Sequence, residues 1–198
     1  MKIGLSGIEG FLASKLQECK EHSWTTSEDA VDIFLHIGSP TFTSDTIDTP
    51  ASKIMHKYVR DSIDLFDRLE SKKIPIVFAS STGVDDIQLD HSGSTSYNLS
   101  KLFLENYLIH NCSKYLILRI GTIYSRSAAD ILAMKPDRIQ RRILQGNLSN
   151  ISTSDYYLDV NVFVNTTLDQ LNSIDNRIVE YELDQLSLIN LVRLTKNG

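Results

Sequence analysis

Two side chains that can exchange a proton stand four residues apart in this sequence, Tyr97 and Lys101. In an α-helix residues with this spacing lie on one face, one above the other, so an ammonium comes beside a phenol. A phenol ordinarily loses its proton near pH ~10, but a fixed positive charge nearby favours the phenolate and lowers its pKa. The spacing is common by chance, so the prediction of a general acid–base depends on the segments that precede it.

A glycine-rich turn follows the first apolar segment of the chain. Residues 2–6 predict a strand, and Gly7, Gly10 and Ala13 lead into a helix predicted over 10–20. Such glycines permit a tight turn and let a pyrophosphate approach backbone N–H groups at the helix start. An ordinary strand-to-helix turn is the alternative interpretation. The position directly after the first strand favours phosphate binding.

Small hydroxyl side chains end a second apolar segment. Residues 75–80 predict a buried parallel strand, and Ser81 and Thr82 follow it. Open α/β sheets bind ligands at the carboxyl ends of their strands. A serine there can bond the oxygen that Tyr97 protonates or deprotonates. Plain turn chemistry is again the alternative, since Ser and Thr are common after strands.

Together these segments resemble the extended branch of the short-chain dehydrogenase/reductase superfamily, the NAD-dependent epimerase/dehydratases. Residues 1–13 look like the opening strand and cofactor turn of that family, and residues 32–40 look like its "D-v-v-i-H-l-A-a" strand. Residues 97–105 match "Y-x-x-S-K-x-x-x-E", and residues 116–124 look like "v-i-L-R-x-x-n-v-Y-G". The resemblance implies an α/β fold, a Rossmann-like doubly wound parallel sheet with a reduced C-terminal substrate cap.

The resemblance also implies hydride transfer to or from a nicotinamide, on a nucleotide-linked sugar or a related hydroxyl or carbonyl substrate. Tyr97 becomes the acid–base, Lys101 lowers its pKa and holds the nicotinamide ribose, and Ser81 orients the reacting oxygen. The residues expected to bind the cofactor are Gly7, Ile8, Glu9, Gly10, Phe11, Leu12, His36, Ile37, Gly38, Ser80, Tyr97 and Lys101. Those expected to bind the substrate are Ser39, Ser81, Thr82 and Thr122.

The chain departs from the family pattern at several positions. Asp85 and Asp86 stand where the family usually has Tyr-Gly, and Tyr58 takes the place of a common active-site asparagine. Residues 154–157 loosely resemble "R-D-f-v" but lack its arginine, which often contacts the substrate's phosphates. Three arginines of a helix predicted over 136–145 are candidates to replace it, with a solvated helix face as the alternative: Arg138, Arg141 and Arg142.

The largest departure is a deletion. The family normally has two strands and a helix where this chain has only residues 21–30, with residues 22–26 as a candidate second strand. Residues 27–30 reach roughly 14 Å when fully extended, whereas a parallel crossover usually needs about a dozen residues or more. The second strand is therefore very short or not a regular parallel partner. A cut-back adenosine side keeps a second class open, a nucleotide-binding or regulatory module without turnover.

NAD is expected as the cofactor rather than NADP. The 2′-phosphate of NADP calls for a basic residue, but residues 25–29 hold hydroxyls and acids, and Glu9 adds a negative charge in the turn. Glu28 or Asp29 is a candidate to accept a bond from a ribose hydroxyl. Exposed loop acids without a ligand are an equally good interpretation.

Length and composition predict one domain over residues 1–198, and the resemblance implies that residues 125–157 form a small substrate cap. The chain is expected to be cytoplasmic. A net charge of −5 gives no case for nucleic acid, and no apolar run approaches the ~18 residues of a membrane span. The chain opens on a core strand rather than a signal peptide. Cys19 and Cys112 lack metal or redox spacing and the five histidines are scattered, so no metal site is expected.

The remaining elements alternate, as in a parallel sheet. Further strands are predicted over 31–37, 115–121 and 177–182, and further helices over 51–71, 96–111, 160–172 and 184–195. The helix 96–111 is apolar around most of its circumference, so it must bury two sides. Family members often pair through these two helices, which predicts a homodimer through residues 51–71 and 96–111. Alternatively, the cap or a loop of the same chain covers the second apolar side of this helix.

Overall fold

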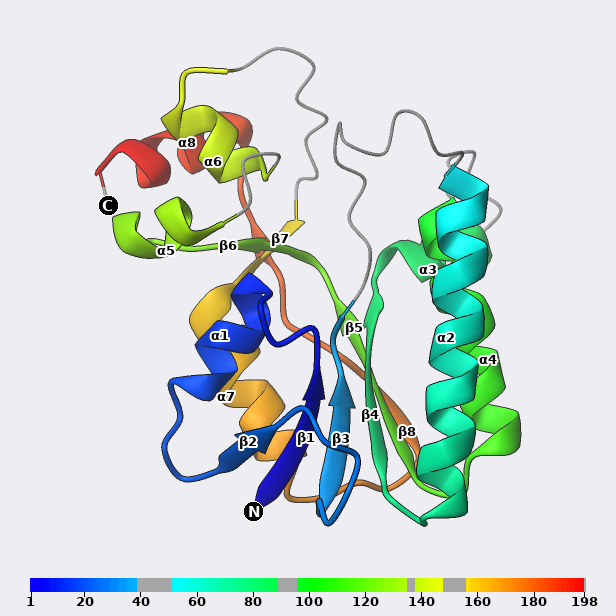
Figure 1. The fold of residues 1–198 in the computed structure, drawn as a ribbon. Helices are drawn as coiled ribbons and strands as arrows, with labels where there is room; N and C mark the ends of the chain where they lie inside the picture. The colour runs from blue at the N-terminus through cyan, green and yellow to red at the C-terminus, as the bar shows by residue number, and fades with distance from the viewer. Residues whose placement is uncertain (39–50, 89–95, 135–137, 148–155, 198) are drawn as a thin grey trace.

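A parallel six-stranded sheet forms the centre of the computed structural model, which describes residues 1–38, 51–88, 96–134, 138–147 and 156–197 (Figure 1). The order of the strands across the sheet is β2-β1-β3-β4-β5-β8. Every neighbouring pair in it is parallel. Their bounds are β1 Lys2–Ser6, β2 Ser23–Thr25, β3 Ile33–His36, β4 Ile76–Ser81, β5 Tyr115–Ile120 and β8 Arg177–Glu180. The predicted α/β class is confirmed.

Helices cover both faces of this sheet, as the doubly wound arrangement requires. Helices α1 (Phe11–Gln17) and α7 (Val160–Gln170) lie on one face, and α2 (Ala51–Ser71) and α4 (Ser96–Asn111) lie on the other (Figure 1). Successive side chains of a strand point to opposite faces of the sheet, so they pack alternately into the cores on its two faces. On β3, Ile33 and Leu35 pack into the core under α1 and α7, whereas Phe34 packs into the core under α2 and α4.

A second, smaller sheet lies beyond the carboxyl ends of the central strands (Figure 1). It contains β6 (Thr122–Tyr124), β7 (Tyr156–Asp159) and β9 (Asp184–Gln185). Three helices accompany it, α5 Ala128–Ala133, α6 Ile139–Leu144 and α8 Leu188–Asn197. A separate buried cluster that includes Tyr124 and Leu191 holds this unit together. The sequence did not predict these strands, because segments of two to four residues show no alternation long enough to detect.

The deletion after α1 has a definite structural outcome. β2 is only three residues long but pairs in parallel with β1, Lys2 opposite Ser23. Residues 26–32, the crossover loop, then carry the chain past β1 to β3 with no helix. The loop turns through Ala30 in the left-handed conformation, with a φ of 51°. Of the two outcomes expected for the second strand, the very short one is correct.

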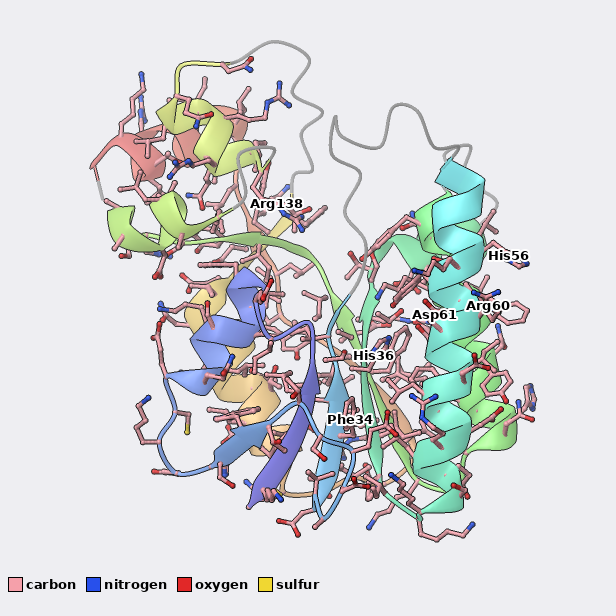
Figure 2. All side chains as sticks on the ribbon, in the orientation of Figure 1. Phe34, His36, His56, Arg60, Asp61 and Arg138 are labelled. Atoms are coloured by element: carbon pink, nitrogen blue, oxygen red, sulfur yellow. The ribbon has the colours of Figure 1, made fainter. Side chains whose placement is uncertain are left out.

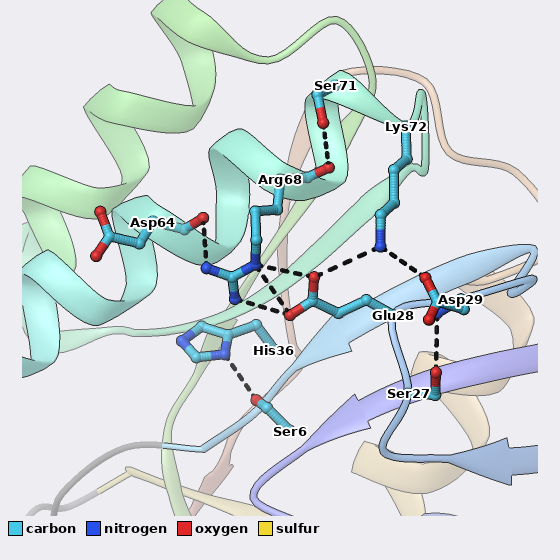
Figure 3. A network of polar contacts seen from close by, with 9 residues as sticks. All are labelled: Ser6, Ser27, Glu28, Asp29, His36, Asp64, Arg68, Ser71 and Lys72. Atoms are coloured by element: carbon cyan, nitrogen blue, oxygen red, sulfur yellow. Dashed lines mark hydrogen bonds and ion pairs between the residues drawn. The ribbon is translucent and has the colours of Figure 1, made fainter.

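Ion pairs connect the crossover loop to the C-terminal end of α2 and to Lys72, which follows it (Figure 3). The guanidinium of Arg68 donates to Glu28 at 2.7 and 3.0 Å, and Lys72 Nζ donates to Asp29 at 2.8 Å. The bond from Arg68 lowers the pKa of Glu28. These two acids, candidates for a ribose contact in the sequence, are engaged by the helix on the α2 face of the sheet.

The helices were also compared with the length and apolarity of a membrane span. Within the described ranges none is long and apolar enough to cross a bilayer.

Candidate active site

Lys101 is buried at the centre of the candidate site. Its side chain, on the second turn of α4, is 1% exposed. The ammonium donates to the backbone oxygen of Ala79 on β4 at 2.6 Å and to the Tyr58 hydroxyl on α2 at 2.9 Å. It also lies 4.7 Å from the centre of the Phe78 ring. Burial lowers the pKa of Lys101 to about 7, although the nearby Glu105 carboxylate opposes the shift.

Tyr97 stands one helical turn before Lys101, half-buried at the start of α4. The Lys101 ammonium lies 5.6 Å from the centre of the Tyr97 ring, and a cation over an aromatic face is attracted by its quadrupole. The structure therefore brings the predicted pair together in a helix, with the positive charge beside the phenol. This arrangement suits the pair to acid–base chemistry.

Ser80 and Ser81 end β4 on opposite sides of the strand. Ser80 is buried and donates to Glu105 Oε1 at 2.5 Å. Ser81 is only half-buried, and its hydroxyl accepts a bond from the backbone N–H of Gly83 at 3.2 Å. Since Ser80 is engaged in the core, Ser81 is the more accessible of the two serines at the strand end. Thr82 follows it, half-buried as well.

The turn after β1 approaches the end of β3 closely. Gly7 has a φ of 72°, and a Cβ built on it would lie 2.5 Å from the Cα of Gly38. Gly10 N donates to Gly7 O at 2.8 Å and stands at the N-cap of α1, where no side chain caps the helix. The first N–H groups of a helix lack internal partners, so this turn suits a phosphate.

The other residues expected around that turn have different surroundings. Glu9 is exposed and Phe11 is half-buried. Ile8, Leu12 and Ile37 pack against the core under α1 and α7. Thr122 is exposed on β6 of the small sheet, and Ser39 lies outside the described residues.

His36, also expected at the cofactor, points into the core on the α2 face of the sheet (Figure 2). Its Nδ1 lies 2.6 Å from Ser6 Oγ and its Nε2 lies 3.0 Å from Ser62 Oγ. The ring stacks at 5.9 Å between centres on both Tyr58 and Phe78. Burial lowers the pKa of His36 to about 3, so the imidazole is neutral at physiological pH.

A buried ionic network that the sequence did not predict holds α4 against the sheet. The Arg119 guanidinium on β5 forms two bonds with Glu105, at 2.8 and 3.1 Å, and a third with Asp85 at 2.5 Å. Glu105 and Asp85 raise the pKa of Arg119. Because Glu105 stands one turn after Lys101 on α4, this network fixes the helix that carries the acid–base pair. Glu105 and Arg119 fall inside family-like segments of the sequence, and that was the available signal.

The candidate phosphate-binding arginines separate into two kinds. Arg141 donates to the backbone oxygen of Leu132 at 2.5 Å and so belongs to the small unit's own structure. Arg138 is exposed at the N-cap of α6 (Figure 2), and Arg142 is half-buried on the same helix. Residues 154 and 155 of the expected motif lie outside the described residues.

No protein-family model matches this sequence, and no curated protein matches it either. Its structure resembles that of UDP-glucose 4-epimerase from Thermotoga maritima, solved with UDP-glucose, at a TM-score of 0.69 and 15% identity over 100% of this chain and 82% of that one. It also resembles the structure of WbmF from Bordetella bronchiseptica, solved with NAD+. The TM-score is 0.71 and the identity 13%, over 99% of this chain and 77% of that one. The structure of RMD from Pseudomonas aeruginosa, complexed with NADPH, matches with a TM-score of 0.64 and an identity of 16%, over 93% of this chain and 80% of that one. The chain thus shares the fold of these solved structures.

Proposed function

We propose that this chain is an NAD-dependent oxidoreductase of the epimerase/dehydratase type, acting by hydride transfer on a nucleotide-linked sugar or a related hydroxyl or carbonyl. The observation that carries the proposal is the buried Lys101 ammonium beside the Tyr97 ring. Burying an ammonium is costly unless strong partners offset it. Within the part of the chain that the structure describes, Lys101 has two hydrogen-bond partners, and both are neutral. A group held at such a cost beside a phenol is typical of a catalytic site.

The residues present fit a nicotinamide dinucleotide at the carboxyl ends of β1, β3 and β4. The β1–α1 turn would hold the pyrophosphate on backbone N–H groups. Lys101 has three N–H donors, and two of them bond Ala79 and Tyr58 within the described residues. We assign the third to a ribose hydroxyl. The nicotinamide, when bound, accepts or supplies the hydride.

The proton chemistry falls to side chains of this protein. When a carbonyl is reduced, the Tyr97 O–H bond breaks and its proton passes to the carbonyl oxygen as the hydride reaches the carbon. The phenolate left behind is stabilised by the Lys101 ammonium. Ser81 donates to the same oxygen and so orients it. A positioned acid of this kind contributes ~10²–10⁴ in rate.

For the cofactor we infer NAD in preference to NADP. At the end of β2, Thr25 and Thr26 offer hydroxyls to a ribose. The cations nearest the crossover loop, Arg68 and Lys72, are already paired with acids. Glu9 remains exposed in the turn as a negative charge. Titration calorimetry with each dinucleotide tests the inference, and tighter binding of NADP would contradict it.

The test of function compares the wild type with Tyr97→Phe. The assay follows NADH fluorescence while NAD is incubated with UDP-sugars and GDP-sugars. Because an epimerase or a dehydratase returns the hydride to the sugar, it also follows conversion of each sugar by chromatography. The variant keeps the ring's packing and should bind NAD as the wild type does, while its turnover falls by about 10²–10⁴. Equal turnover in the two proteins would remove Tyr97 from the mechanism.

A binding module without turnover is the second candidate, and the three-residue β2 with its helix-free crossover favours it. The same experiment separates the two. Calorimetric binding of NAD with no hydride transfer in the wild type, across all substrates, would support the module.

We also propose a homodimer through α2 and α4. Leu99 and Phe103, one turn apart on α4, are 49% and 54% exposed. Phe103→Asp should shift the mass in light scattering from dimer to monomer, because it places a charge in the apolar interface. Leu132→Asp is the matched control, since Leu132 is equally exposed, at 55%, but lies on α5. A monomeric wild type at micromolar concentration would contradict this proposal.

A further inference from the structure

The buried network around Arg119 holds the strand residue that precedes Ser81. Ser80 lies opposite Arg119 in the register of β4 and β5. Its hydroxyl donates to Glu105 Oε1 at 2.5 Å, and Glu105 Oε2 accepts from Arg119 Nη2 at 2.8 Å. Both charged side chains are buried. The backbone just before Ser81 is therefore fixed to α4, the helix that carries Lys101.

Asp85 connects the same guanidinium to the chain that follows Ser81. It lies on the first turn of helix α3 (Gly83–Gln88), and its carboxylate accepts from Arg119 Nη1 at 2.5 Å. A helix of six residues has too few backbone bonds to be stable by itself, so contacts with the rest of the fold must hold it. Asp85 is also one of the positions where this sequence departs from the family pattern, so this anchor belongs to this chain.

The start of α3 orients the Ser81 hydroxyl. The backbone N–H of Gly83 donates to Ser81 Oγ at 3.2 Å, and the N–H of Asp85 donates to the backbone oxygen of Thr82 at 3.0 Å. A hydroxyl that accepts from the backbone keeps its own O–H as a donor, and the proposed function uses that donor on the reacting oxygen. A displacement of α3 would therefore move the hydroxyl that orients the substrate.

Helix α3 also packs closely against the first turn of α4. A Cβ built on Gly83 would lie 2.5 Å from Asn98 Nδ2, so the two helices approach each other at a glycine. Asn98 directly follows Tyr97 in the sequence. The position of Ser81 relative to Tyr97 thus depends on where α3 sits.

We propose that Asp85 is a positioning residue. Its ion pair with Arg119 holds α3 in place, and α3 holds the Ser81 hydroxyl in the orientation that the acid–base pair requires. Asp85 acts through α3 and Ser81 rather than on the reacting atoms. The role given to Ser81 rests on the proposed function, whereas the effect of the ion pair on α3 is independent of it.

Two variants that remove one negative charge from the same nitrogen separate positioning from charge. Asp85→Asn removes the partner on α3. Glu180→Gln is the matched control, because its carboxylate lies 3.4 Å from the same Nη1 but belongs to β8. The carboxylates of Asp85 and Glu180 both reach solvent, so both variants should fold.

The first measurement is amide hydrogen exchange by NMR, without substrate or cofactor. In Asp85→Asn the backbone amides at positions 83 and 85 should exchange at least about tenfold faster relative to the amides of α2, because α3 opens locally. In Glu180→Gln they should exchange as in the wild type. Wild-type exchange in Asp85→Asn, an equal acceleration in both variants, or an equal acceleration throughout α2 would overturn the proposal.

The second measurement is turnover with NAD and the UDP-sugars and GDP-sugars of the functional assay. For Asp85→Asn, kcat should fall by about 10–10². Its KM, and its Kd for NAD by calorimetry, should stay within about twofold of the wild type, because a misplaced Ser81 loses a bond made in the transition state. For Glu180→Gln, kcat should stay within about twofold.

The two measurements distinguish failure of this proposal from failure of the proposed function. Faster exchange at α3 with an unchanged kcat in Asp85→Asn would overturn the proposal, since α3 would then position nothing that the reaction needs. A wild type that converts none of the sugars would refute the proposed function, while the exchange rates still decide whether Asp85 holds α3.

Discussion

Replacing Lys101 by methionine should change how the stability of the fold depends on pH. The pKa of Lys101 falls from 10.5 to about 7 on folding. Since one pKa unit corresponds to about 1.4 kcal/mol, the ionisable amine lowers the free energy of unfolding by about 4 kcal/mol at pH 7. Methionine fills a similar volume without a charge. The variant also loses the donor to the Ala79 oxygen, which costs about 1–3 kcal/mol at any pH.

The sign of the pH dependence follows from proton uptake. Between about pH 7 and pH 10.5 the unfolded state binds more protons at this lysine than the folded state, so wild-type stability rises with pH. At about pH 9.5 the penalty has fallen to about 1.4 kcal/mol, a recovery of about 3 kcal/mol relative to pH 7. Well below pH 7 both states are protonated and the penalty is constant. His36, with a pKa of about 3, stays neutral throughout this window.

Urea unfolding followed by circular dichroism, at several pH values from 7 to 9.5, measures this slope. We expect the stability of the wild type minus that of Lys101→Met to increase by about 3 kcal/mol across the series. Groups common to both proteins cancel in the difference. Lys57→Met, at an exposed lysine of α2, is the control and should run parallel to the wild type. If Lys101→Met also runs parallel, the lysine does not have a depressed pKa and the argument from burial is wrong.

Three further substitutions test the supporting structure. Gly7→Ala forces a side chain into a φ of 72° and against the Gly38 backbone; urea unfolding should show a loss of about 1–3 kcal/mol, and an unchanged midpoint would contradict the close approach. Arg119→Met leaves the buried Glu105 carboxylate without its counter-charge, so we expect a loss of about 3–5 kcal/mol in the same assay, much of it recovered by adding Glu105→Gln. Arg68→Ala releases the crossover loop from α2; because this pair is partly exposed, stability should fall by only about 0.2–1 kcal/mol, while amide exchange in the loop speeds up.

The sequence predicts the central sheet well because its strands β4 and β5 are six residues long and each begins with four hydrophobic residues. Length and apolarity are local signals of a buried parallel strand. The strands of the small sheet have two to four residues. Helices α3 (Gly83–Gln88) and α5 have six residues each, below the length at which helical periodicity is clear. Such elements form because tertiary packing holds them, which a local pattern does not record.

The candidate site divides in the same way. The pairing of Tyr97 with Lys101 follows from helical spacing alone. The contact of Lys101 with Tyr58 joins residues 43 apart in the sequence, so only the fold reveals it. The sequence could have predicted which way the His36 side chain points, since His36 lies two residues after Phe34 on β3 and therefore on the same face of the sheet. The sequence could not have predicted the pairing of Glu28 with Arg68, because that pairing depends on the path of the crossover loop.

The short β2 segment and the acid–base pair lie at different places in the sheet. The short segment is therefore expected to affect the affinity for the cofactor rather than the chemical step. The deletion affects β2, which is the edge strand, whereas Lys101 and its partners surround β4, three positions along. The elements that hold Lys101 are β4, α2 and α4, which have 6, 21 and 16 residues. The adenosine end of a dinucleotide would lie toward β2 and the nicotinamide end toward β4. We therefore expect a wild-type chain that binds NAD more weakly than longer relatives do, with a turnover step that still depends on Tyr97.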